Sequence, residues 1–154
     1  MLHEHTKQYL TIKNQLPSLA TMTATEARQL RKHAPKATRP VAKQITIHQQ
    51  RIEVRDGAHI PIRMYTPAGQ GPFPVILYFH GGGWVLNDLD TCHESCSFLA
   101  QQTGHIVISV AYRLAPEYRF PVPVQDCYDS FLWATEQATH FNGLATKVSV
   151  AGDS

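Results

Sequence analysis

The sequence has 154 residues, of which 43% are apolar and 17% charged, with a formal net charge of +2. This length suits one globular domain or part of one, and it is too short for two hydrophobic cores. The composition excludes a charge-driven disordered chain, and no stretch approaches the ~18 apolar residues of a membrane-spanning helix. Ten prolines and nine glycines favour many short elements over a long helical bundle.

Charge is distributed unevenly along the chain. Residues 1–55 carry ten Lys and Arg against three acidic residues (+7), whereas residues 56–154 carry four against nine (−5). Such a basic segment raises nucleic acid or a membrane surface as a partner. Its cations are spread from Lys7 to Arg55 without a cluster, so we expect neither. The first residues lack the architecture of a secretory signal, which favours a cytoplasmic protein.

Two helices are predicted in residues 1–40, which we interpret as a helical cap segment. Residues 4–16 place apolar side chains at three- and four-residue steps before Pro17. Thr23 and Glu26 then form a capping box, the signal for the start of a second helix.

An antiparallel hairpin is predicted next. Apolar and polar residues alternate over residues 44–54 and again over 59–66, and Asp56-Gly57 between them is a turn pair. Two continuous apolar runs follow, at 75–79 and 106–110, as expected of strands covered on both faces, and residues 147–151 are predicted to form a third buried strand.

Helices are predicted between these buried strands. A capping box at Thr91 and Glu94 predicts one that ends at Gly104, and a second covers residues 122–141. Its inward-facing residues are predicted to be Tyr128, Phe131, Leu132 and Ala138. The alternation predicts an α/β fold with a mostly parallel sheet over residues 41–154.

Three cysteines, Cys92, Cys96 and Cys127, cannot all pair within the chain. Reduced, partly buried thiols are expected, and a disulfide or metal site at Cys92 and Cys96 is the alternative.

Chemistry is indicated first by His80-Gly81-Gly82-Gly83-Trp84, directly after the first buried strand. Consecutive glycines let the backbone present N–H groups to an anion without a side chain intervening. A phosphate-binding loop is disfavoured because no Gly-Lys-Ser/Thr or Gly-x-Gly-x-x-Gly pattern is present. A tight glycine turn without chemical use remains the plain alternative.

Gly152-Asp153-Ser154 after the last buried strand is the first half of Gly-x-Ser-x-Gly, the sharp turn that raises a nucleophilic serine. Three residues are a weak signal alone. The signal becomes strong because of its context: the glycine loop comes first, about seventy residues of alternating elements follow, and Gly-x-Ser comes after them.

Four motifs together resemble the hormone-sensitive-lipase-like esterases of the α/β-hydrolase fold, over about residues 40 to 154. They are His80-Gly81-Gly82-Gly83-Trp84, Tyr112-Arg113-Leu114-Ala115-Pro116-Glu117, Phe120-Pro121 with Asp126, and Gly152-Asp153-Ser154. The resemblance implies an α/β-hydrolase domain truncated after the nucleophile-elbow strand. It also implies hydrolysis of short-to-medium acyl esters, without metal or cofactor.

Site residues follow from the same resemblance. It implies Ser154 as the nucleophile and the amides of Gly82 and Gly83 as oxyanion-hole donors. His80 and Gly81 would support that loop, and Trp84 would line the substrate pocket, with a core tryptophan as the alternative. The triad acid and histidine follow the serine in this fold, so we expect the chain alone to be inactive and to need a carboxyl-terminal half as its partner.

Other acids and bases are assigned structural roles. His80 precedes the serine and belongs to the glycine loop, so a role as general base is disfavoured. Asp153 is interpreted as a variable elbow position. Asp126 and Glu117 are expected to satisfy buried donors, with Arg113 as the partner of Glu117. A non-catalytic binder on this scaffold, or an amidase or deacetylase, remains as an alternative function.

Overall fold

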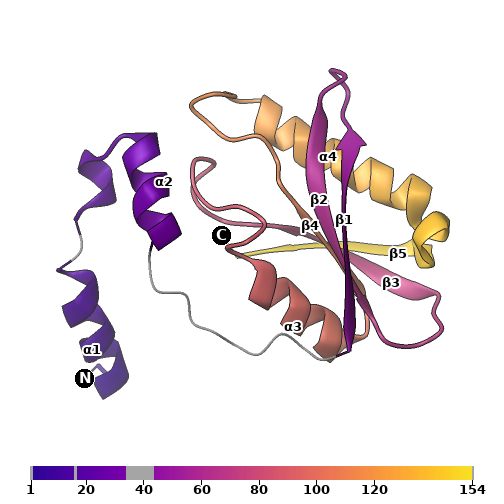
Figure 1. Ribbon diagram of the computed structural model, residues 1–154, viewed down its shortest axis with the longest axis horizontal. Coiled ribbons are helices and arrows are strands. Elements are labelled where there is room, and N and C mark those ends of the chain that lie inside the picture. The colour runs from indigo at the N-terminus through magenta and orange to yellow at the C-terminus, as the bar shows by residue number, and fades with distance from the viewer. Residues whose placement is uncertain (1, 16, 34–43, 154) are drawn as a thin grey trace. The chain divides into compact units, whose positions relative to one another are not determined.

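The computed structural model describes residues 2–15, 17–33 and 44–153, and the chain divides into two compact units, residues 1–33 and 34–154. The first unit holds α1 (Glu4–Lys13), η1 (Leu19–Thr21) and α2 (Ala24–His33). The second unit holds β1 (Ile45–Glu53), β2 (His59–Pro67), β3 (Phe73–Phe79), α3 (His93–Thr103), β4 (Ile106–Val110), α4 (Val122–Gln137), η2 (Ala138–Phe141) and β5 (Gly143–Gly152) (Figure 1). The predicted boundary at residue 40 lies outside the described residues.

The predicted capping box at the start of α2 is confirmed. The Thr23 hydroxyl accepts from the Glu26 amide at 3.3 Å, and the Glu26 carboxylate accepts from the Thr23 amide at 2.8 Å. These bonds satisfy donors that a helix start leaves open. The Thr23 hydroxyl also donates to the Glu26 carboxylate at 2.7 Å, and this bond, with that from the Thr23 amide, lowers the pKa of Glu26. The other predicted helix, α1, ends at Lys13.

The second unit is built on one five-stranded sheet with the order β1-β2-β4-β3-β5. β1 and β2 form the predicted hairpin, and β2 also pairs antiparallel with β4. β3 lies parallel between β4 and β5. The predicted α/β architecture is confirmed, and the parallel strands β3, β4 and β5 are the three that were predicted as buried strands.

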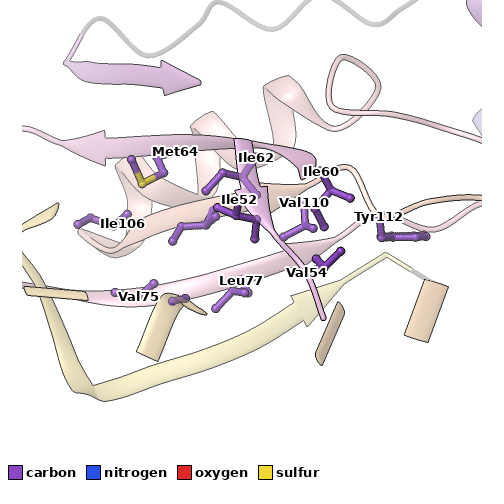
Figure 2. Packing of buried hydrophobic residues seen from close by; sticks show 12 residues of the cluster. Ile52, Val54, Ile60, Ile62, Met64, Val75, Leu77, Ile106, Val110 and Tyr112 are labelled. Atoms are coloured by element: carbon purple, nitrogen blue, oxygen red, sulfur yellow. The ribbon is translucent and has the colours of Figure 1, made fainter. Parts of the chain in front are cut away.

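Two apolar clusters cover opposite faces of this sheet, because side chains alternate along a strand. In β4, Ile106, Ile108 and Val110 belong to one cluster and Val107 to the other. The first cluster includes Ala134 of α4, and the second includes Cys96 of α3. Figure 2 shows the first cluster, in which strands β1 to β4 all contribute side chains. The helices α3 and α4 therefore lie on opposite faces (Figure 1).

The start of α3 differs from its prediction. Thr91 makes no cap, and the helix begins at His93 after Cys92 without a side-chain cap bond. Asp88 accounts for the difference, since its carboxylate accepts from the Thr91 hydroxyl at 2.7 Å and from the amides of Asp90 and Thr91. The predicted end is confirmed, because Gly104 adopts φ 66° and its amide donates to the Ala100 carbonyl.

The buried face of α4 also differs from its prediction. Tyr128 and Leu132 are exposed, whereas Asp126, Ser130 and Ala134, spaced four residues apart, are buried. Phe131 packs against the first apolar cluster, as predicted, so apolar periodicity located part of the buried face and missed its polar residues, Asp126 and Ser130. The prediction of Ala138 as buried is confirmed.

Asp126 is buried because Arg113 neutralises it. Its carboxylate accepts from the Arg113 backbone amide and from both Nε and Nη2, at 2.7–2.9 Å. The Arg113 Nη1 donates to Asp56 at 2.7 Å in the hairpin turn, so this guanidinium links the turn to α4. The sequence favoured Glu117 as the partner of Arg113, and the fork is instead filled by these two aspartates. Their hydrogen bonds raise the pKa of Arg113 and lower that of Asp56.

β5 differs from a strand covered on both faces. Val148 packs against the α4-side cluster, but Val150, on the same face, is 60% exposed. β5 is the outermost strand on one side of the described sheet and pairs there with β3, so fewer described residues cover it. Within the described residues, no helix is long and apolar enough to cross a membrane.

Candidate functional site

The glycine loop and the end of β5 leave the sheet at the same edge. Phe79, the last residue of β3, is the register partner of both Val110 in β4 and Gly152 in β5. These strands are parallel, so the loop at residues 80–84 and Asp153 both follow carboxyl ends of neighbouring strands. This edge is where open α/β sheets place their sites.

His80 begins the loop and is buried, with 3% of its surface exposed. Its ring stacks on Tyr112 with 4.4 Å between centroids. Its Nδ1 lies 2.9 Å from the Gly81 carbonyl oxygen and 3.3 Å from the Tyr112 hydroxyl oxygen. A carbonyl oxygen only accepts, so Nδ1 is the donor in its bond to Gly81.

Tyr112 completes this arrangement, because its hydroxyl donates to the His80 carbonyl oxygen. Burial raises the pKa of Tyr112, which keeps the donating proton in place at neutral pH. His80 thus has the contacts expected of a residue that holds the loop, and its Nδ1 is occupied as a donor.

Gly81 is held from both sides. Its amide donates to the Asp153 carboxylate at 2.6 Å, and its carbonyl accepts from the Asn87 side-chain Nδ2 at 2.8 Å as well as from His80. Asp153 is therefore more than a variable elbow position, because it joins the end of β5 to the glycine loop. A bond to a charged acceptor is roughly twice as strong as a neutral one.

The next peptide is also fixed. The Gly82 carbonyl accepts from the amides of Val85 and Leu86 at 3.2 and 3.0 Å. In a trans peptide the C=O and N–H bonds point in opposite directions. The carbonyls of Gly81 and Gly82 point into the loop, so the amides of Gly82 and Gly83 point away from it. Neither amide donates to another described residue.

Glycine is required at position 82. Its φ is 123°, and a Cβ there would lie 2.5 Å from the Leu86 carbonyl oxygen. Gly83 adopts φ 62°, and a Cβ on it would meet no atom within 4 Å. The loop continues in Trp84, which also has a positive φ of 64° and is 48% exposed. Its ring meets Tyr112 edge-on at 5.6 Å, so the core alternative for this tryptophan is wrong.

The three cysteines are free, as predicted. Cys92 and Cys96 pack in the cluster on the α3 side, and the Cys92 Sγ lies 3.0 Å from the Ser109 hydroxyl. Among the residues that the structure describes, no group of three His, Cys, Asp or Glu side chains could hold a metal ion.

The structure thus brings together Gly81, Gly82, Gly83 and Asp153 around His80. Ser154 itself lies outside the described residues. Sequence reasoning missed Asn87 and the loop contact of Asp153. Asn87 carried one available signal, since asparagine is among the few non-glycine residues that adopt positive φ in turns.

The sequence and the structure were compared with those of known proteins. A family profile described as alpha/beta hydrolase fold matches residues 76–154. The chain is 45% identical over 96 residues to the carboxylic ester hydrolase LipN of Mycobacterium tuberculosis, which covers 62% of this chain and 26% of that protein. It is 42% identical over 106 residues to ethyl acetate hydrolase of Pseudomonas putida, covering 67% of this chain and 33% of that protein.

Two solved structures are similar to this chain. An ester-hydrolase from the metagenome of Lake Arreo superimposes with a TM-score of 0.90 at 29% identity, covering 100% of this chain and 51% of that one. An esterase of Pyrobaculum calidifontis gives 0.82 at 31% identity, covering 100% and 49%. The chain spans about half the length of these structures and a smaller share of the curated relatives. By its profile match and its fold, the chain belongs to the alpha/beta hydrolase fold family, and its motifs resemble those of the hormone-sensitive-lipase-like esterases.

Proposed function

We propose that this chain supplies the nucleophile and the oxyanion loop of a carboxylic ester hydrolase. A carboxyl-terminal half of the fold would supply the rest, and the two halves together are called the complete hydrolase below. The observation that carries the proposal is the 2.6 Å bond between the Gly81 amide and Asp153. It ties the glycine loop to the residue that precedes Ser154 in the sequence.

The reaction would begin with attack of the Ser154 hydroxyl on the ester carbonyl carbon, while a histidine general base takes the hydroxyl proton. That histidine and its acidic partner would come from the carboxyl-terminal half. The tetrahedral intermediate carries a negative oxygen, for which the outward amides of Gly82 and Gly83 are the proposed donors. Its collapse releases the alcohol, which takes up the proton, and water then hydrolyses the acyl-serine.

His80 would act on this reaction through the loop. Its Nδ1 proton faces the Gly81 carbonyl, and its own carbonyl accepts from Tyr112. A buried, stacked ring of this kind is better suited to holding a loop rigid than to shuttling protons. The mechanism requires no metal or cofactor.

The proposed substrates are small esters with short-to-medium acyl groups, acetates first among them. Two relatives are named for acetates, the ethyl acetate hydrolase and the versiconal hemiacetal acetate esterase of Dothistroma septosporum. Trp84 is the proposed pocket wall, because a half-exposed aromatic ring held against Tyr112 follows the oxyanion loop directly.

A series of p-nitrophenyl esters tests this proposal. We expect the complete hydrolase to turn over p-nitrophenyl acetate, with kcat/KM falling as the acyl chain lengthens beyond a medium size. EDTA should leave the rate unchanged. Turnover of acetanilides but not of esters would indicate an amidase. Binding of an ester without turnover would indicate a non-catalytic binder, and either outcome would overturn the proposal.

A further inference from the structure

We propose that Asn87 is a positioning residue for ester hydrolysis, which holds the Gly81 carbonyl so that the Gly82 amide faces the developing oxyanion. This inference rests on the proposed function. It assigns Asn87 no contact with substrate, because its effect passes through the peptide that joins Gly81 to Gly82.

The backbone of Asn87 gives the first reason. Its φ is 74°, in the left-handed region that glycine enters freely and that asparagine adopts at some cost. A turn alone would be served as well by glycine. The side chain present here reaches back six residues, and its Nδ2 donates to the Gly81 carbonyl at 2.8 Å.

The other half of the amide gives the second reason. The Asn87 Oδ1 is buried and has no hydrogen-bond partner among the described residues. A carbonyl oxygen cannot accept from Oδ1, so the amide must present Nδ2 to Gly81. Burying an unpartnered acceptor is unfavourable. The single bond to Gly81 is therefore what this side chain contributes.

Because the peptide is planar, the bond to the Gly81 carbonyl also fixes the direction of the Gly82 N–H. The C=O of Gly81 and the N–H of Gly82 belong to one planar unit and point in opposite directions. Asn87 and His80 hold the oxygen from the loop side. The N–H consequently faces away from the loop, where it is free to meet an oxyanion.

Two substitutions in the complete hydrolase test this role. Asn87→Gly removes the donor and keeps the positive φ, whereas Asn87→Asp keeps the shape of the side chain and loses the donor. We expect each to lower kcat on p-nitrophenyl acetate by about tenfold, with KM changed by less than about twofold. Removing an oxyanion donor outright lowers kcat by about 10²–10³-fold, and a misaligned donor retains part of its effect. Asn87→Gly should leave Tm nearly unchanged.

Asn142 offers a matched control. It also adopts a positive φ, 61°, and its Nδ2 also donates to a backbone carbonyl, that of Gln70 at 2.9 Å. It precedes β5 and so lies at the opposite edge of the sheet from Gly81. We expect Asn142→Gly to retain the parent kcat, even where Tm falls.

The outcomes separate this inference from the proposed function. An active parent with an unchanged kcat in both Asn87 variants would overturn the inference alone. A parent that hydrolyses no ester would overturn the proposed function. The role of Asn87 in holding the loop is then tested by the NMR order parameter of the Gly82 amide. We expect it to fall from a rigid value of about 0.85 to below about 0.6 in Asn87→Gly. An unchanged order parameter would overturn the role of Asn87 in holding the loop.

Discussion

Ser154→Ala in the complete hydrolase is expected to abolish ester turnover, lowering kcat on the order of 10⁴-fold or more. The hydroxyl oxygen forms the covalent bond to the acyl group, and no other atom can replace it. The substitution removes one oxygen atom, far less than the deletions that destabilise protein cores, so Tm should change little. Steady-state turnover of p-nitrophenyl acetate and a thermal melt measure both effects.

Ser149→Ala, in β5, is the matched control. Its hydroxyl donates to the Val75 carbonyl at 3.2 Å within the sheet, and we expect the parent kcat in this variant. If Ser154→Ala kept turnover within tenfold of the parent, Ser154 would not be the nucleophile.

The 154-residue chain expressed alone is expected to be inactive toward esters and to self-associate. Among the described strands, β5 pairs with β3, and no described strand pairs with its other edge. Unpaired strand edges are templates for pairing with another chain. We expect most of the purified chain to sediment as oligomers or aggregates, without a cooperative thermal transition.

Exposed apolar side chains on α4 and β5 strengthen this expectation. Val150 lies on the same face of the sheet as Val148, which packs on the α4 side, and it is 60% exposed. Three exposed apolar residues lie at four-residue steps along α4: Val124 at 43%, Tyr128 at 56% and Leu132 at 39%. Phe120, before the helix, is 83% exposed. Exposed apolar surface of this kind favours association.

Two measurements separate the causes. Val150→Lys places a charge near the open edge, and we expect it to lower the sedimenting fraction without creating activity. Co-expression with the carboxyl-terminal half of the fold should give a soluble complex that hydrolyses p-nitrophenyl acetate. A monodisperse monomer of the unmodified chain with a cooperative melt would contradict the open-edge argument.

The sheet could be predicted from sequence because its strands follow simple burial rules. The runs at 75–79 and 106–110 are apolar at almost every position, and both strands are covered on both faces. The segment at 147–151 was also predicted to be buried, yet it contains Lys147 and Ser149, and β5 is largely exposed. Composition shows which side chains a strand could bury, but whether they are buried depends on the elements that pack beside the strand in the fold.

Errors in the helices arose where polar contacts replace apolar ones. The buried face of α4 is anchored by Asp126, which is neutralised by Arg113 from a loop 13 residues earlier. Apolar periodicity cannot detect such a pair. Thr91 likewise does not cap the helix, because its hydroxyl donates a hydrogen bond to Asp88, three residues before it.

The site was predictable as far as its motifs reach. The glycine loop and Asp153 could be placed at one sheet edge from their positions after buried strands. The contacts that fix the loop, from Asn87 and Asp153 to Gly81, depend on positive φ angles and on register between β3 and β5. Neither is encoded in a local pattern, so these two contacts required the structure.

Covalent labelling tests the central claim most directly. Diethyl p-nitrophenyl phosphate reacts with an activated serine, whose oxygen bonds to phosphorus as p-nitrophenolate leaves. With the complete hydrolase we predict one diethylphosphoryl group per molecule, located by mass spectrometry on Ser154 and absent from Ser154→Ala. Label on a different residue, or equal labelling of Ser154→Ala, would contradict the assignment of this chain as the carrier of the nucleophile.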